Sequence, residues 1–494
     1  MNDKVTIRRL ATGVPGLDAI LGGGLPEFSF NLIAGPPGSG KTTLAHQIMF
    51  ALATRERPAL FFTVLGEPPM KMMRYQQQYA FFDPDKINEA IRFVNLSDEV
   101  ATDDFAQVLE RIAKEVEAFS PALVFVDSFR SAMLEAQRQP QGALSLQQFV
   151  QQLGMQLSTW QATTFLVGEY NPENESHPVF TVTDGLLSMQ QSVHRNSMVR
   201  QIQVLKMRGQ ATSPGVHTFR ITGNGIEVFP SAVVRDDNGA AREAAKSTRS
   251  RKRLAMGVPR LDEMLGGGLP EGFSLLIAGP SGSGKSIIAT AFLAEGVRCG
   301  EPGVIVAFEQ TPSQSLAPKI DDMVRAGQIG LINTRSLDLS IDEIVHHLTE
   351  QIHRRQAKRV VIDSLSGFEL AVAPTFREDF RESLFRMVAV LSGLGVTVVM
   401  LSELEDRYTD LRFSPYGSAF LTDAILVLRY IEVDSQLKRV MSVVKVRDSV
   451  HSKEIRQFEI TDAGVVIGDA MPEYEGLLGG RPKRAPRSDE DGAR

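Results

Sequence analysis

The 494-residue sequence contains a single cysteine, Cys299, and a single tryptophan. One thiol can form no internal disulfide and cannot supply the several cysteines of a structural zinc cluster. The sequence therefore predicts a protein of a reducing compartment. We interpret Cys299 as a small apolar residue beside a helix end.

Long apolar runs are also missing. No segment approaches the roughly eighteen uninterrupted apolar residues that cross a bilayer, and the first ten residues, MNDKVTIRRL, lack the apolar core of a signal peptide. We expect a cytoplasmic protein that makes no contact with membranes.

Positive charge is not in excess. The 53 Lys and Arg residues stand against 59 Asp and Glu residues, which gives a formal net charge of −6. This balance argues against a dedicated nucleic-acid binder, because phosphate contacts need clustered Lys and Arg. The protein-kinase signatures H-R-D and D-F-G are absent as well.

The sequence instead contains an internal duplication. Residues 13–42 and 257–286 align without a gap and share GVP, LD, LGGGLPE and LIAGP followed by GSGK. The similarity continues in VDSFRS and IDSLSG (126–131 and 362–367), and in VLKMRG and VVKVRD (204–209 and 443–448). The chain is therefore predicted to consist of two related halves.

The predicted boundaries follow composition. We assign residues 1–234 and 254–478 to two domains. The polar stretch 235–253 has no hydrophobic period and is typical of a solvated linker, although its RSRKR run could touch nucleic acid. The stretch 479–494 is too polar to pack and is predicted to be a disordered tail.

Each half alternates short apolar runs with helical patterns, as in FNLIAG, ALFFTVL and ALVFVDS of the first half. This order predicts an α/β fold with a mostly parallel sheet covered by helices on both faces. Residues 217–230 and 456–468 alternate around a Gly-containing turn, which predicts an antiparallel hairpin at the end of each half.

Two glycine-rich loops, GPPGSGKT (35–42) and GPSGSGKS (279–286), fit the pattern G-x-x-x-x-G-K-[ST] between a strand and a helix. Glycines let backbone N–H groups point at an anion, and the following lysines reach its β- and γ-phosphates. The loops therefore predict nucleotide binding. The predicted binding residues are Gly35, Gly38, Ser39, Gly40, Lys41, Thr42, Thr43, Gly279, Gly282, Ser283, Gly284, Lys285 and Ser286.

An aspartate ends an apolar run in each half, Asp127 in the first and Asp363 in the second. A carboxylate at a strand end beside a phosphate loop can hold Mg²⁺ through water, and the hydroxyls of Thr42 and Ser286 can bind the same ion. The alternative is that each aspartate only caps the next turn. The duplication favours the metal role.

Taken together, these elements resemble KaiC, the double-domain ATPase of bacterial clocks, within the RecA-like P-loop superfamily. The resemblance covers about residues 8–478 and depends on TGVPGLD and MGVPRLD before GGGLPE, on both phosphate loops, on VDSFRS and on the K-x-R segments. It implies two tandem RecA-like domains, bound ATP and Mg²⁺, and a homohexameric ring with ATP held between adjacent subunits.

The resemblance also gives a role to two cationic pairs, Lys206 with Arg208 and Lys445 with Arg447. Residues two apart on a strand project from one face. In the family such a pair reaches the γ-phosphate of the neighbouring subunit, where it stabilises transition-state charge. The alternative is an edge strand that carries positive charge for solubility.

The family places two adjacent glutamates after the second strand, and this chain keeps one in each half. Glu309 occupies the position of the family's general base; in the first half that position is Gly66, and the acid is Glu67. Neighbouring residues of a strand point to opposite faces, so Glu67 is the weaker candidate. Glu169 and Glu403, which end the next strand, could substitute.

The chain departs from the family's phosphorylation site. Ala419 and Phe420 stand where clock KaiC has adjacent Ser and Thr acceptors, although Ser418 and Thr422 are close by. The leading hypothesis is a ring ATPase that acts as a nucleotide-dependent clock or signalling switch, with clock or signalling proteins as partners. The alternatives are a Ser/Thr autokinase and a DNA-dependent ATPase of the RecA or DnaB kind.

Overall fold

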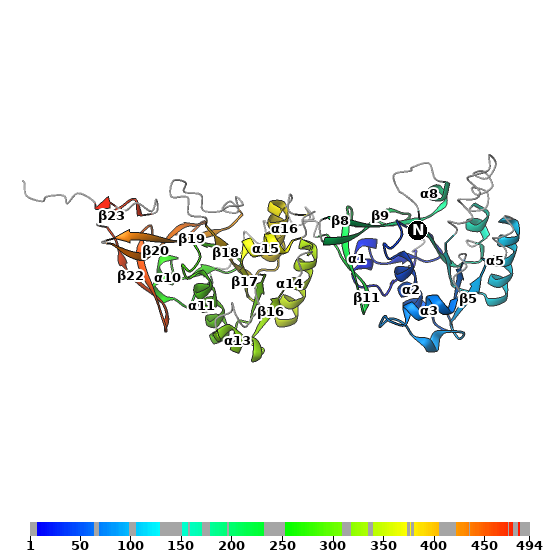
Figure 1. Cartoon of the computed structure of the whole chain (residues 1–494), viewed down its shortest axis with the longest axis horizontal. Coiled ribbons are helices and arrows are strands. Elements are labelled where there is room, and N and C mark those ends of the chain that lie inside the picture. Colours follow the sequence, from blue (N-terminus) through cyan, green and yellow to red (C-terminus); the bar gives the residue numbers. More distant parts are fainter. Residues whose placement is uncertain are drawn as a thin grey trace, which may run out of the picture. The chain divides into compact units, whose positions relative to one another are not determined.

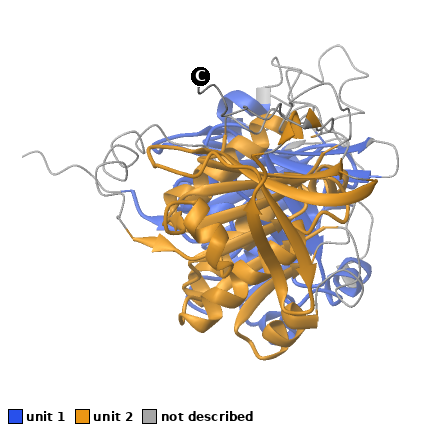
Figure 2. Ribbon diagram, turned by 90° about the vertical axis from the view of Figure 1, so that its left-hand side faces the viewer, with its two compact units in different colours: residues 1–231 blue, residues 232–494 orange. Residues whose placement is uncertain are grey.

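In the computed structural model the central strands consist mainly of consecutive buried apolar residues. Such strands are covered on both faces, so neither face needs polar side chains. The chain divides into two compact units, residues 1–231 and 232–494, coloured separately in Figure 2. The structure describes residues 7–63, 69–97, 105–128, 151–156, 159–169, 178–194, 197–231, 252–308, 318–333, 339–372, 376, 380–404, 421–433, 435–472, 474–477 and 483–484.

Unit 1 is built on one sheet of nine strands in the order β11-β10-β9-β8-β3-β7-β6-β4-β5. The six strands from β8 to β5 are parallel, and β9, β10 and β11 add an antiparallel edge. The elements are β1 (Arg9–Leu10), α1 (Leu17–Leu21), β2 (Leu25–Pro26), β3 (Phe30–Ala34), α2 (Lys41–Leu52), β4 (Ala59–Thr63), α3 (Pro69–Gln76), η1 (Pro84–Lys86), β5 (Ile91–Asn95), α5 (Phe105–Phe119), β6 (Leu123–Asp127), β7 (Thr163–Gly168), α8 (Pro178–Val182), β8 (Gly185–His194), β9 (Ser197–Met207), β10 (His217–Thr222) and β11 (Gly225–Phe229).

Unit 2 repeats this sheet in the equivalent order β16-β15-β17-β18-β14-β19-β20-β21-β22. Its elements are β12 (Arg253–Leu254), α10 (Pro259–Met264), β13 (Leu269–Pro270), β14 (Ser274–Gly279), α11 (Lys285–Arg298), β15 (Gly303–Ala307), α13 (Pro318–Arg325), β16 (Ile329–Asn333), α14 (Ile341–Arg355), β17 (Arg359–Asp363), α15 (Leu365–Ala371), α16 (Phe380–Gly393), β18 (Thr397–Glu403), β19 (Ala424–Val433), β20 (Gln436–Val446), β21 (Arg456–Thr461), β22 (Gly464–Ala470), β23 (Tyr474–Glu475) and β24 (Lys483–Arg484).

Helices cover both faces of each sheet (Figure 1). In unit 1, Ile33 of β3 packs with helices α1 and α2, whereas its neighbour Leu32 packs with α5 on the opposite face. Unit 2 has the same two cores, one with α10, α11 and α13 and one with α14, α15 and α16. The α/β fold predicted from the sequence is confirmed. None of the helices in the described ranges has the length and apolar character needed to cross a bilayer.

The antiparallel edge is larger than the sequence indicated. The predicted terminal hairpins are present as β10–β11 and β21–β22. A second, longer hairpin in each unit, β8–β9 and β19–β20, joins them to the parallel strands. Strands β9 and β20 mix buried and exposed residues without strict alternation, so only their K-x-R ends were predicted as strand and the hairpins were missed.

Two predicted boundaries need correction. Arg253, assigned to the linker, pairs with Pro270 as part of β12, and Lys252 forms an ion pair of 3.0 Å with Glu301. Lys483–Arg484, assigned to a disordered tail, pairs with β23 as strand β24. Composition misses such contacts because backbone hydrogen bonds and exposed ion pairs need no apolar side chain.

His46 distinguishes the core of unit 1 from that of unit 2. Its ring lies on α2, stacks on Phe61 with centroids 4.5 Å apart, and is 1% exposed. Among the described residues neither ring nitrogen has a hydrogen-bond partner. Burial lowers the pKa of His46 to about 3. At the same place in unit 2, Thr290 donates its hydroxyl to the Ser286 carbonyl.

We expect unit 1 to lose stability in acid through His46. The unfolded chain binds the proton near pH 6.5 and the folded one only near pH 3, so stability falls as the pH drops below about 6.5. At pH 5 the loss is about 2 kcal/mol. His46→Leu should remove this dependence in urea unfolding followed by the fluorescence of Trp160, which lies in unit 1.

The matched control is His353→Leu, on an exposed position of α14 in unit 2, which should leave the acid dependence of the Trp160 transition unchanged. An unchanged pH dependence in His46→Leu would show that the buried ring does not control acid stability.

Candidate functional site

The site lies where the parallel strands of each sheet end. Parallel strands bring their carboxyl ends to one edge, so the phosphate loop after β3 lies on the same edge as Asp127, the last residue of β6. Strand β7 separates the two strands in the sheet. In unit 2, β18 separates β14 from β17, which ends at Asp363.

Each phosphate loop leads into a helix whose first N–H groups carry no side-chain cap. Helices α2 and α11 begin after Gly40 and Gly284, which have left-handed φ angles of 98° and 101°. A Cβ on Gly40 would lie 2.9 Å from Ile221, and one on Gly284 would lie 3.0 Å from Ile460. Both positions therefore require glycine, and the uncapped N–H groups at the two helix starts can bind an anion.

The loop lysines fold back over their own loops. The Lys41 ammonium donates to the Pro36 carbonyl at 2.8 Å, and that of Lys285 donates to the carbonyls of Gly279 and Pro280, each at 2.8 Å. Burial lowers the pKa of Lys285, against the opposing charges of Glu403 and Asp363. Lysines held at the loops in this way can contact phosphates there.

The sequence-predicted metal residues meet in both units. The Thr42 hydroxyl donates to Asp127 Oδ2 at 2.6 Å, and the Ser286 hydroxyl donates to Asp363 Oδ2 at 2.9 Å. Burial raises the pKa of Asp363, while the bond from Ser286 and the charge of Lys285 oppose that rise. Each unit therefore places one carboxylate and one hydroxyl beside its phosphate loop.

This donor set fits Mg²⁺, which prefers oxygen ligands and is commonly held by one or two carboxylates together with substrate phosphates. Within the described ranges, no three His, Cys, Asp or Glu side chains gather to hold a metal by themselves. Occupancy of this position would therefore depend on a bound phosphate.

The cationic pair of unit 1 lies elsewhere. Lys206 lies in β9 and Arg208 follows its end; the Lys206 ammonium donates to the Thr183 carbonyl at 2.5 Å and Arg208 donates to Asp184 Oδ1 at 3.1 Å. Asp184 also accepts from the backbone N–H of Phe30, the first residue of β3, at 3.0 Å. The pair thus lies at the start of the strand whose other end carries the phosphate loop.

Unit 2 has the same arrangement. Lys445 donates to the Thr422 carbonyl at 2.7 Å, Arg447 pairs with Asp423 at 3.4 Å, and Asp423 accepts from the backbone of Ser274 at 3.0 Å. The register of both long hairpins shifts by one residue just before the lysine, as a β-bulge does. Burial and then the adjacent arginine lower the pKa of Lys206 and Lys445.

The structure describes only some of the candidate general bases. Gly66, Glu67 and Glu309 lie outside the described residues. Glu403 ends β18 in register with Gly279 of the phosphate loop, and Glu169 follows β7 at the equivalent place. Both substitutes proposed from the sequence therefore end the strand next to the phosphate-loop strand.

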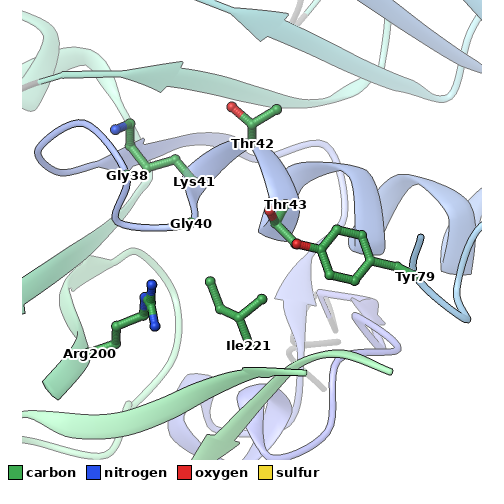
Figure 3. Close-up of a pocket in the computed structure, with 8 residues that line it drawn as sticks. All are labelled: Gly38, Gly40, Lys41, Thr42, Thr43, Tyr79, Arg200 and Ile221. Carbon is green, nitrogen blue, oxygen red and sulfur yellow. The ribbon is translucent and has the colours of Figure 1, made fainter. Parts of the chain in front are cut away.

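The sequence analysis missed a wall of the first site. A pocket of about 450 Å³ opens at the start of α2 (Figure 3). Beside residues of the phosphate loop it is lined by Tyr79, Arg200 and Ile221. Arg200 lies opposite Gln191 in the ladder, and the Gln191 amide donates to the Pro37 carbonyl of the loop at 3.2 Å.

Unit 2 places Tyr430 and Arg439 at the positions of Gln191 and Arg200. They are cross-strand partners, and the Arg439 guanidinium lies 5.4 Å from the centre of the Tyr430 ring. The Tyr430 hydroxyl approaches Gly282 of the phosphate loop. One signal in the sequence could have found these arginines, since each lies six residues before the lysine of its cationic pair.

We expect Asp363→Asn to weaken the Mg²⁺-dependent part of ATP binding by unit 2 about 10- to 100-fold, the usual cost of losing an outer-shell metal contact. The measurement compares ATP affinity with and without Mg²⁺ in a Lys41→Ala background, in which the measured binding comes mainly from unit 2. Asp469→Asn, at a side chain that is 93% exposed, is the control. An equal loss of affinity without Mg²⁺ would contradict the metal role.

Comparison with known proteins agrees with this geometry. A family model described as "ATPase: KaiC" matches the chain twice, at residues 10–233 and 254–471. The circadian clock oscillator protein KaiC of a Picosynechococcus strain is 26% identical over 492 residues, which cover 97% of this chain and 93% of that protein.

Two further relatives have similar names. Circadian clock oscillator protein KaiC 1 of Synechocystis is 26% identical over 496 residues, with 97% of this chain and 92% of the relative covered. The KaiC protein of Prochlorococcus marinus is 25% identical over 497 residues, with 98% and 97% covered. Because the family model matches both halves, the chain belongs to the KaiC ATPase family, with two such domains in tandem.

Proposed function

We propose that the protein is a Mg²⁺-dependent ATPase that assembles as a homohexameric ring and acts as a nucleotide-dependent switch in a clock or signalling system of the cytoplasm. The curated relatives named as clock oscillator proteins support the clock context. The position of the cationic pairs is the observation that supports assembly into a ring.

Each pair is too far from the phosphate loop of its own unit to act there. Asp184, which holds Arg208, is bonded to the start of β3, and the loop follows the end of that strand. Strand rise alone separates these points by about 13 Å in unit 1. A pair at that distance does not reach the phosphate of its own unit, and in the proposed ring it would serve the same unit of an adjoining copy.

Within one site, the residues have separate tasks. The N–H groups at the start of α2 or α11 and the loop lysine bind the phosphates. Bound Mg²⁺ would neutralise phosphate charge while Thr42 with Asp127, or Ser286 with Asp363, holds it. The cationic pair of the adjoining copy would stabilise the charge that develops during transfer to water. Glu309 would accept a proton from that water in unit 2.

Hydrolysis is favoured over self-phosphorylation. Thr422, one of the two hydroxyl residues near the family's acceptor position, is fully buried. Ser418, Ala419 and Phe420 lie outside the described residues. The net charge of −6 likewise gives no support to a DNA-dependent motor.

Complementation between copies tests the shared site. Chains with Lys285→Ala and chains with Arg447→Ala are assayed for ATP turnover separately and after mixing and reassembly. We expect the mixture to exceed the average of the separate rates, because an intact loop of one chain then meets the intact arginine of the other. A mixture equal to the average would mean that Arg447 does not act on a neighbour.

The control mixes Lys285→Ala with a chain that carries both Lys285→Ala and Arg447→Ala. No intact unit 2 loop is then present, so mixing should add nothing.

The two candidate bases give a separate prediction. Positioned general bases contribute about 10²- to 10⁴-fold to a rate. We expect Glu309→Gln to lower the turnover of unit 2 within that range, measured with Lys41→Ala. Glu67→Gln, measured with Lys285→Ala, should have a smaller effect on unit 1. Equal losses would contradict the unequal roles assigned to the two halves.

A further inference from the structure

Gln47 of α2 connects the phosphate-loop helix of unit 1 to edge strand β11. Its side chain is 3% exposed. The Gln47 amide nitrogen donates to the Ile226 carbonyl at 3.1 Å, and the Ile226 N–H donates to Gln47 Oε1 at 2.7 Å. One side chain thus satisfies both backbone groups of a residue on a different element.

The residue held in this way supports the pocket. Ile226 lies directly opposite Ile221 in the β10–β11 ladder, and Ile221 lines the pocket. Both isoleucines also approach Gly40, the last residue of the loop before α2. Movement of β11 away from α2 would therefore carry Ile221 away from the helix start.

The opposite side of the pocket is tied to the same hairpin. Tyr79 stacks on Phe81 with ring centroids 5.2 Å apart, and the Ala80 N–H donates to the Gly223 carbonyl in the β10–β11 turn at 2.8 Å. A Cβ on Gly225 would lie 2.5 Å from Gln47 Oε1 and 2.8 Å from Phe81. The hairpin is therefore packed between Gln47 and the segment that carries Tyr79.

Unit 2 has a different residue at the position of Gln47. The position equivalent to Gln47 is Ala291, which is partly buried against the core and whose side chain has no hydrogen-bonding group. The connection that follows β15, residues 309–328, contains no aromatic residue. The difference between the units lies outside the phosphate-loop motif that they share.

We infer that Gln47 is a positioning residue that holds the wall formed by Tyr79 and Ile221 against the sugar and base of the nucleotide in unit 1. In Figure 3, Thr42 and the Tyr79–Ile221 wall lie on different sides of the start of α2. The Thr42 hydroxyl meets Asp127 on the metal side, so the nucleoside extends toward the wall. This inference rests on the proposed binding of ATP.

The test separates the nucleoside from the phosphates. In a full-length Lys285→Ala background, affinities for Mg-ATP and for Mg-tripolyphosphate are measured for Gln47 and for Gln47→Met. Methionine keeps the volume but loses both hydrogen bonds. We expect ATP binding to weaken about tenfold, or about 1.4 kcal/mol, and tripolyphosphate binding to stay within about twofold because the loop itself is intact.

The matched control is Gln210→Met. Gln210 follows β9, and its amide also makes two bonds to the backbone, to the carbonyls of Leu21 and Gly24, at 2.5 and 2.8 Å. It should leave the ratio of the two affinities unchanged. Equal weakening of both ligands by Gln47→Met would reveal a general loss of stability and overturn the inference, as would no change in either ligand.

If the Lys285→Ala parent binds tripolyphosphate and ATP equally well, no wall contacts the nucleoside. That result would refute the role of Gln47 but leave ATP binding by unit 1 intact. A parent that binds neither ligand would refute ATP binding by unit 1, and the inference with it. A second variant, Tyr79→Ala, should lower ATP affinity in the same direction without affecting tripolyphosphate.

Discussion

Strand direction is the constraint on which the rest of this structure depends. Parallel strands bring the phosphate loop and the aspartate proposed to hold Mg²⁺ to the carboxyl ends of the strands in each sheet, whereas the antiparallel return of β9 and β20 brings the cationic pairs to the opposite ends. Asp184 and Asp423 fix this separation, because each joins an arginine to the first residue of the phosphate-loop strand. Within each unit, the phosphate loop and the cationic pair therefore lie at opposite ends of the same strand.

The two units share the candidate phosphate-binding residues and differ in the residues packed behind them. Both have a left-handed glycine at the helix start and a hydroxyl bonded to an aspartate. One turn further along the helix, His46 and Gln47 of unit 1 correspond to Thr290 and Ala291 of unit 2. These substitutions change core packing and the support of the pocket wall, so duplicated loops can differ in how firmly they hold a nucleoside.

Local patterns predicted much of this architecture. The apolar runs identified the parallel strands, the loops identified the helix starts, and the Gly-containing turns identified the terminal hairpins. The long β8–β9 hairpin and the pocket residues Tyr79, Arg200 and Ile221 were missed, because their positions depend on strand register between distant segments. Gln47 carries no motif, since its role arises only where β11 lies against α2.

The central claim is that each phosphate loop binds a nucleotide and that a second copy of the chain completes the site. Native mass spectrometry of the full-length protein with Mg-ATP tests both parts of this claim in one spectrum. The account predicts a closed ring with two nucleotides for each chain. A monomer that carries two nucleotides, or an assembled ring that carries none, would contradict it.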